Sequence, residues 1–252
     1  MNAKLPIILG ALCTAALLSA DTLLEVAPGT VLQDRWNRKL HKNFSTGSSK
    51  TGVEAVQEKG KTIARYQSGS STLYQISGTE SCGTENLTFT VLLRAEGKSG
   101  EAYPLYAGAG SLQKPGLRLG IRADKEGLQA YGLFVAVAGN EKCNNFVSVR
   151  MNGDLRIEPG KWTVLTLSAN RSGDLQLFVN GELAASKSIR AYEKENLYPK
   201  KPLFSTLLPK GKADAEQPIR IDIAELSIRN ELLSSTEILR EAEDMLDSME
   251  QE

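Results

Sequence analysis

Two acidic residues in the string Arg220–Glu225 come closest to the spacing of a hydrolytic carboxylate pair. Glycoside hydrolysis uses two carboxyl groups flanking the scissile bond, about 5–5.5 Å apart in retaining enzymes. Asp222 and Glu225 are three positions apart, so on a regular strand their side chains point to opposite faces. The sequence therefore predicts an ion pair between Asp222 and Arg220 and a structural role for Glu225, and we assign no catalytic residue.

Other familiar chemistries lack the residues that they need. His41 is the single histidine of the chain and no Gly-x-Ser-x-Gly motif occurs, which argues against a Ser-His-Asp hydrolase. The chain has no Cys-x-x-Cys motif and no cysteine–histidine spacing typical of zinc sites. No cofactor is predicted. A calcium site cannot be identified from the sequence, because acidic residues are scattered without the spacing of calcium ligands. Examples are Asp124, Glu126, Asp154 and Asp174.

Residues 1–20 have the pattern of a signal peptide. Lys4 is followed by an apolar run over Leu5–Leu18 and then by small residues, with cleavage expected near Ala20. The apolar run is too short for a comfortable membrane span. We expect export to the periplasm, the cell surface or the extracellular space, with no membrane attachment after cleavage. An uncleaved N-terminal anchor is the alternative.

The cysteine count is consistent with export. Cleavage removes Cys13 and leaves Cys82 and Cys143, an even number that favours a disulfide in an oxidising compartment. Such a bridge would close a loop of about 60 residues and stabilise the fold by up to about 4 kcal/mol. The alternative is two free thiols in a reducing compartment.

Strand signals run from about residue 61 to residue 230. Leu117–Arg122 alternates apolar and polar residues, as a half-buried strand does. Trp162–Leu167 and Leu175–Val179 read as two strands joined by a turn, and Asn180-Gly181 then predicts a two-residue hairpin. Short strands separated by Gly, Asn and Asp turns favour an antiparallel sandwich.

Six segments share features with one known family. They are Lys61–Gln75, Asn86–Arg94, Lys161–Leu167, Ser172–Glu182, Ile221–Ile228 and Leu233–Ile238. Together they resemble the laminin-G-like, concanavalin A-like jelly-roll superfamily, with a tryptophan-led strand, a strand ending in Val-Asn-Gly, and a closing strand before a short helix. The resemblance covers residues 61–239 and implies a two-sheet antiparallel jelly roll. Ala224 departs from it, because many members have an acidic residue there.

The predicted organisation has four parts. They are a signal peptide over 1–20, an N-terminal segment over 21–60, a concanavalin A-like sandwich over 61–232 and an acidic amphipathic helix over 233–252. A first strand followed by a loop is one interpretation of the second part. The third part carries the family resemblance.

The C-terminal helix has its own start signal. Ser234-x-x-Glu237 is a capping box. One helical face carries the apolar residues Ile238, Ala242, Met245 or Leu246, and Met249. From Glu231 onward the chain contains eight acidic residues and one arginine, so we expect this helix to lie against the more basic remainder. A helix that docks a partner is the alternative.

Candidate ligand-binding residues are aromatic side chains outside the clear strands. Sandwich lectins bind sugars through loops or on a concave sheet, with aromatic rings and planar polar groups. Trp36, Tyr192 and Tyr198 are the candidates, together with the basic loop over 194–212, because long loops on rigid scaffolds often carry function. A solvated charged loop is the alternative.

Composition limits the class of function. The chain has 252 residues, 41% of them hydrophobic, with 30 basic and 30 acidic residues. Equal charge argues against a nucleic-acid partner. We expect an exported, non-catalytic module that binds a glycan or a protein. The alternatives are a structural or assembly component whose C-terminal helix docks a partner, and a divergent glycoside hydrolase or polysaccharide lyase.

Overall fold

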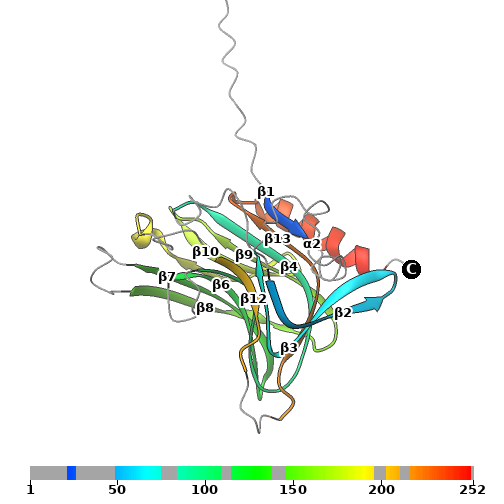
Figure 1. Ribbon diagram of the computed structural model, residues 1–252. Coiled ribbons are helices and arrows are strands. Elements are labelled where there is room, and N and C mark those ends of the chain that lie inside the picture. Colours follow the sequence, from blue (N-terminus) through cyan, green and yellow to red (C-terminus); the bar gives the residue numbers. More distant parts are fainter. Residues whose placement is uncertain are drawn as a thin grey trace, which may run out of the picture.

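The computed structural model describes residues 22–26, 49–74, 84–108, 115–137, 146–195, 203–210 and 216–250. These residues contain thirteen strands, a 3-10 helix and an α-helix (Figure 1). The strands are β1 (Thr22–Val26), β2 (Ser49–Glu58), β3 (Lys61–Tyr74), β4 (Leu87–Glu96), β5 (Gly100–Gly108), β6 (Gly116–Asp124), β7 (Gly127–Val137), β8 (Phe146–Ile157), β9 (Trp162–Ala169), β10 (Asp174–Val179), β11 (Glu182–Ser188), β12 (Leu203–Leu207) and β13 (Arg220–Arg229). The helices are η2 (Arg190–Tyr192) and α2 (Ser235–Glu250).

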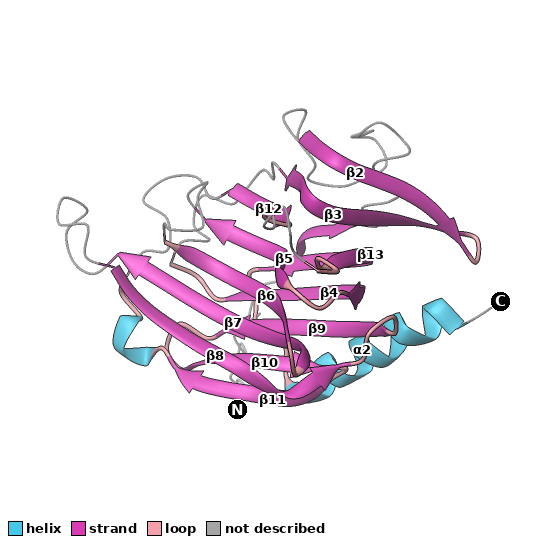
Figure 2. Cartoon of the chain, turned by 90° about the horizontal axis from the view of Figure 1, so that it is seen from below, coloured by secondary structure: helices cyan, strands magenta, loops and turns pink. Residues whose placement is uncertain are grey.

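The strands form one antiparallel hydrogen-bonded path that folds into two layers (Figures 1 and 2). Its order is β11-β10-β9-β4-β13-β3-β12-β5-β6-β7-β8, with β1 beside β13 and β2 beside β3. We call the part from β11 to β13 the first sheet and the part from β12 to β8 the second sheet. Strand β3 belongs to both, because Tyr66 pairs with Ile221 of β13 and Thr72 pairs with Thr206 of β12. The predicted fold class, a two-sheet antiparallel sandwich with a C-terminal helix, is confirmed.

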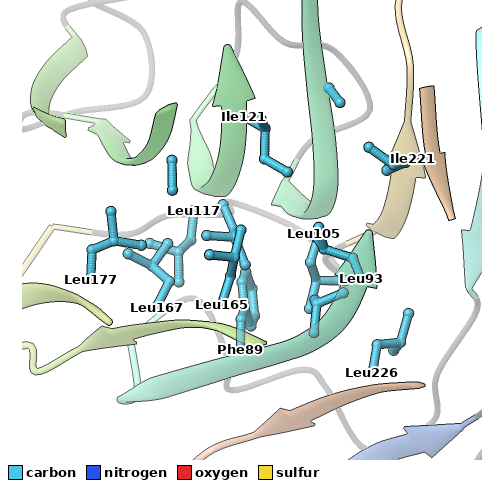
Figure 3. Packing of buried hydrophobic residues seen from close by; sticks show 14 of the residues in the cluster. Phe89, Leu93, Leu105, Leu117, Ile121, Leu165, Leu167, Leu177, Ile221 and Leu226 are labelled. Carbon is cyan, nitrogen blue, oxygen red and sulfur yellow. The ribbon is translucent and has the colours of Figure 1, made fainter. Parts of the chain in front are cut away.

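The hydrophobic core lies between the two sheets (Figure 3). Phe89 of β4 and Leu165 of β9 belong to the first sheet, and Leu117 and Ile121 of β6 belong to the second; all four are fully buried. Strand β6 alternates these inward residues with glycine and arginine, as a strand with one core face does. Burial of each such side chain stabilises the folded protein by roughly 1.5–3 kcal/mol. The core therefore makes both sheets rigid supports for their outer faces.

The hairpin predicted at Asn180-Gly181 is confirmed. Val179 pairs with Glu182, and the turn residues have φ values of 51° at Asn180 and 82° at Gly181. Two successive left-handed residues give a turn whose twist matches that of antiparallel strands. The Asn180 side-chain oxygen also accepts a hydrogen bond from the Val164 N–H at 2.9 Å, which ties the turn to β9.

Helix α2 covers part of the outer face of the first sheet (Figure 1). The predicted capping box is confirmed, because the Ser234 N–H and hydroxyl both donate to the Glu237 carboxylate at 2.7 Å. Ala242 and Met249 pack in one cluster with side chains of β3, β4, β9 and β13. The apolar stripe of the helix is therefore occupied by the protein's own sheet, which contradicts the alternative of a partner docked on that stripe. No helix in the described part of the chain is long and apolar enough to cross a membrane.

Two expectations about strand positions differ from the structure. The sequence places the sandwich at 61–232 and offers one strand and a loop within 21–60, whereas the described residues there contain two strands, β1 and β2, which pair with β13 and β3. Among the described strands β2 pairs only with β3, and polar composition is typical of such an edge. The predicted loop over 194–212 is wrong where it contains β12. Phe204 and Thr206 of that strand are buried. Its short alternating pattern was not recognised in the sequence, because lysines and prolines surround it.

Candidate binding surface

A β-bulge in β13 brings Asp222 and Glu225 to the same face of the first sheet. The pairing of β13 with β4 shifts between Ile223 and Glu225. The core residues of the strand are Ile221, Ile223, Leu226 and Ile228, so their spacing of two is interrupted once by a spacing of three. One extra residue reverses the alternation, and both carboxylates lie on the outer face. The prediction that they point to opposite faces is wrong.

Asp222 is a buried carboxylate that two arginines hold. Arg65 of β3 donates to both of its oxygens, at 2.8 and 2.9 Å, and Arg94 of β4 donates to Oδ2 at 2.8 Å. Arg220 pairs instead with Glu96 at 2.6 Å, so the predicted Asp222–Arg220 pair is wrong. Residues opposite each other on neighbouring strands are closer than residues two apart on one strand, which favours cross-strand pairs.

These bonds make Asp222 a poor catalytic acid. Burial alone would raise its pKa, but the hydrogen bonds and positive charges of Arg65 and Arg94 outweigh burial and hold the pKa of Asp222 below its ordinary value. A general acid must instead be protonated near the working pH. The surroundings of Asp222 therefore favour a role in organising the surface.

Glu225 faces a different environment. It lines a groove of about 380 Å³ between β13 and α2, and the Lys61 amine lies 3.9 Å from its carboxylate. In the same groove Arg229 donates to both oxygens of Glu241 at 2.8 Å. Asp222 and Glu225 thus have separate partners, which argues against their action as a hydrolytic pair.

Charged side chains of neighbouring strands form two rows on the outer face of the first sheet, which we call the ionic rows. The inner row contains Glu58, Arg94, Asp222 and Arg65, and the outer row contains Glu96 and Arg220. Their strands lie side by side in Figure 2. Arg94 donates to both oxygens of Glu58, at 2.9 and 2.7 Å, and its guanidinium lies 4.8 Å over the Trp162 ring. On β4 and β13, which contribute to both rows, two residues along the strand separate the rows, or about 6.6–6.8 Å.

A polar groove of about 510 Å³ opens beside the outer row. It is lined by Gln67, Ser68, Glu96, Gly97, Gln217, Pro218, Ile219 and Arg220. Gln67 and Gln217 are exposed, and their amides both donate and accept hydrogen bonds. Amide, carboxylate and guanidinium groups, all planar, therefore meet in one concave place.

Close backbone contacts hold one wall of the polar groove. Gly97 lies so near Ile219 that an added Cβ would be 2.6 Å from the Ile219 Cα. The Lys98 N–H donates to the Gln217 carbonyl at 2.8 Å, and the Ile219 N–H donates to the Ser99 carbonyl at 2.9 Å. Gln217 has a φ of 45°, a costly conformation for a residue other than glycine that persists only where its surroundings impose it. The polar side chains thus project from a fixed backbone.

The outer face of the second sheet carries a different arrangement, which we call the tyrosine–arginine layer. It contains Glu101, Tyr103, Tyr106, Arg118, Tyr131 and Arg150. The Tyr131 ring lies across Gly120, where an added Cβ would approach the ring to 2.2 Å, and the Arg150 guanidinium lies 4.1 Å over that ring. Tyr131 is 2% exposed, so its ring offers no free face for stacking.

The other tyrosines of this layer are engaged in the same way. Tyr103 meets Tyr131 edge-on at 6.3 Å, and its hydroxyl donates to Glu101 at 2.7 Å. Arg150 lies 3.7 Å from Glu101, and Arg118 lies 5.3 Å from the Tyr106 ring. Burial raises the pKa of both Tyr103 and Tyr131. The layer is therefore a small packed cluster, and we assign no ligand to it.

Of the ligand-binding residues predicted from sequence, the structure describes Tyr192. Its ring stacks on Phe134 with the centroids 6.4 Å apart, and its carbonyl accepts a hydrogen bond from Arg171 at 3.3 Å. These contacts anchor η2 to the sandwich and do not bring Tyr192 to the polar groove. Trp36 and Tyr198 lie outside the described residues, as do Cys82 and Cys143 of the predicted disulfide.

Sequence reasoning named Asp222 and Arg220 but missed the other residues of the polar groove and the ionic rows. Arg65 and Arg94 each interrupt an apolar run within a strand, which marks the outer face of a half-buried sheet. Gln67 and Gln217 carry no comparable signal, because exposed glutamines are common. Within the described part of the chain no group of His, Cys, Asp and Glu side chains could hold a metal ion.

Comparison with known proteins supports the fold. No protein-family model and no curated protein matches the chain, so the superfamily resemblance stays a prediction. The ligand-binding domain of botulinum neurotoxin serotype D in complex with N-acetylneuraminic acid is 15% identical, with a TM-score of 0.62 over 88% of this chain and 50% of that one. The binding domain of botulinum neurotoxin DC in complex with rat synaptotagmin II is 13% identical, with a TM-score of 0.57 over 80% and 48%.

A third similar structure comes from work on botulinum neurotoxin type C, whose cell entry depends on two ganglioside molecules. It is 12% identical, with a TM-score of 0.57 over 80% of this chain and 47% of that one. This chain therefore spans about half the length of the structures that it matches. At such low identity the likeness shows a shared fold and assigns no ligand.

Proposed function

We propose that this chain is a non-catalytic binding module whose ligand is a glycan held in the polar groove and along the ionic rows. The observation that carries the proposal is the groove of about 510 Å³ lined by planar polar groups on a fixed backbone. Sugar hydroxyls both donate and accept, as do the groups that line the groove when taken together. The volume lies within the range of about 300–1,000 Å³ typical of ligand pockets.

Other observations support parts of this proposal. Two of the similar structures are named for N-acetylneuraminic acid and for gangliosides, but their chains are about twice as long, so the names support a glycan in general without locating it. The two arginine partners of Asp222 support a non-catalytic role. Export, favoured by residues 1–20, would place the module among glycans outside the cytoplasm.

Two glutamine substitutions test the site. Glycan-array screening supplies a ligand, and calorimetry then compares wild type with the double variant Gln67→Ala and Gln217→Gly. Glycine accepts the φ of 45° without strain, so the change removes an amide and leaves the backbone. We expect affinity to fall at least about tenfold, as for two hydrogen bonds lost.

A matched control uses a glutamine elsewhere on the first sheet. Gln176 lies on β10, two strands from β4, and Gln176→Ala should bind as wild type does. The proposal fails if no glycan binds the wild-type chain, or if the double variant binds a glycan with unchanged affinity.

A further inference from the structure

Charge pairing on the first sheet indicates which glycans would fit. We infer, on the basis of the proposed function, that the polar groove and the ionic rows select neutral glycans and disfavour glycans that carry carboxylate or sulfate groups. The basis is that each arginine of this surface already has an anionic partner.

All three arginines of the ionic rows are paired with carboxylates. The pairs are Arg65–Asp222, Arg94–Asp222, Arg94–Glu58 and Arg220–Glu96, with N–O distances of 2.6–2.8 Å. Three arginines and three carboxylates leave the rows without net charge. An anion that approached a guanidinium would meet the carboxylate already bound there, and that repulsion would offset the attraction.

The outer row shows how a neutral ligand would bind. The side chains of Arg220 and Glu96 are 40% and 45% exposed, so both groups reach the polar groove while they remain paired. A sugar hydroxyl can accept from a guanidinium and donate to a carboxylate without separating them. A carboxylate or sulfate group of a ligand only accepts, so Glu96 offers it no partner.

The inner row excludes anions for a second reason. Asp222 is 2% exposed and accepts hydrogen bonds from both Arg65 and Arg94. Drawing either arginine toward a ligand would leave a buried carboxylate short of a partner, which is costly. Arg65 and Arg94 of the inner row are therefore held by Asp222 and are not available to bind an anion.

Matched pairs of glycans test this selectivity. Each glycan that binds on the array is compared by calorimetry with the form that differs by one sialic acid or one sulfate. We expect the neutral form to bind at least about tenfold tighter, with little change in Kd between about 0.02 and 0.5 M salt because no ion pair forms. Equal or tighter binding of the charged form, or affinity that falls steeply with salt, would overturn the inference.

One substitution should shift the selectivity. Glu96→Gln frees the guanidinium of Arg220, and we expect the ratio of charged-form to neutral-form affinity to rise about fivefold, as for one exposed ion pair. Glu126→Gln is the matched control, because Glu126 pairs with Arg156 on the second sheet. An unchanged ratio in the Glu96 variant contradicts the inference. Absence of all glycan binding overturns the proposed function itself, whereas a preference for charged forms overturns only the selectivity.

Discussion

The outer faces of the two sheets both carry arginine side chains, but these arginines have different partners. On the first sheet, Arg65 and Arg94 meet carboxylates across neighbouring strands, and a polar groove opens beside them. On the second sheet, Arg118 and Arg150 lie over tyrosine rings that are almost fully buried. The difference shows that an arginine on a sheet is a binding candidate only where its surroundings leave polar groups accessible.

Gly120 contributes to this difference between the partners of the arginines. On β6 the missing side chain of Gly120 leaves room for the Tyr131 ring to lie flat, and the ring then supports Arg150. The corresponding part of the first sheet has the helix α2 over its apolar residues instead. The polar residues beyond the helix therefore remain at the surface.

Among variants on the two outer faces, Tyr131→Ala on the second sheet is expected to lose the most folding stability. Removing a buried ring that lies between Gly120 and Arg150 should destabilise the protein by about 4 kcal/mol, mainly through lost packing. Chemical denaturation measures this loss, and Tyr131→Phe, which keeps the ring, should lose much less. Glycan binding by the folded variant should persist, since the ring lies on the other sheet. A loss of binding without a loss of stability would mean that the tyrosine–arginine layer is itself a ligand site.

On the first sheet, Asp222→Asn should destabilise the protein by about 3 kcal/mol. The substitution leaves the guanidinium groups of Arg65 and Arg94 without the carboxylate that holds them. Urea unfolding checks the value. Glu96→Gln, at a more exposed pair, should cost no more than about 1 kcal/mol. Equal effects at both positions would contradict the view that the inner row is a buried support.

A smaller effect is expected where glycine makes room for tyrosine. Gly120→Ala places a Cβ 2.2 Å from the Tyr131 ring and should destabilise the fold by about 2 kcal/mol through overpacking. Combination with Tyr131→Ala should remove most of this cost, because the clashing ring is absent. Thermal unfolding of the two single variants and the double variant tests the coupling, and simple additivity would count against it.

The smallest effect concerns pH. The folded-state pKa of Asp222 is lowered, so its contribution to stability is present above its unfolded value of about 3.9 and is lost as the pH falls through the folded value. The midpoint of unfolding should therefore decrease as the pH falls below about 4. The same titration of Asp222→Asn should show a shallower drop, and parallel curves would show that other carboxylates account for the acid sensitivity.

Local sequence patterns predicted the strands well where apolar alternation was regular. The hairpin at Asn180-Gly181 and the capping box at Ser234 and Glu237 were both predictable, because each depends on residues that are neighbours in the chain. Strand β12 was missed because its five residues lie among lysines and prolines. The bulge in β13 was also missed, since no residue type marks it.

The candidate site was less predictable for a related reason. The sequence singled out Asp222 but paired it with Arg220, its near neighbour in the chain. The true partners, Arg94 and Arg65, are 128 and 157 residues away. Strand order brings β3, β13 and β4 together, and that order depends on the whole sandwich.

By itself the sequence determined the antiparallel β character of the chain, its main turns and the start of its C-terminal helix. These features follow from interactions over a few residues, where side-chain alternation, left-handed turn residues and capping hydrogen bonds act. Only the tertiary structure decided which arginine meets which carboxylate, which face the helix covers and where a polar groove opens. Those outcomes depend on contacts between strands distant in sequence, because electrostatics and packing act through space rather than along the chain.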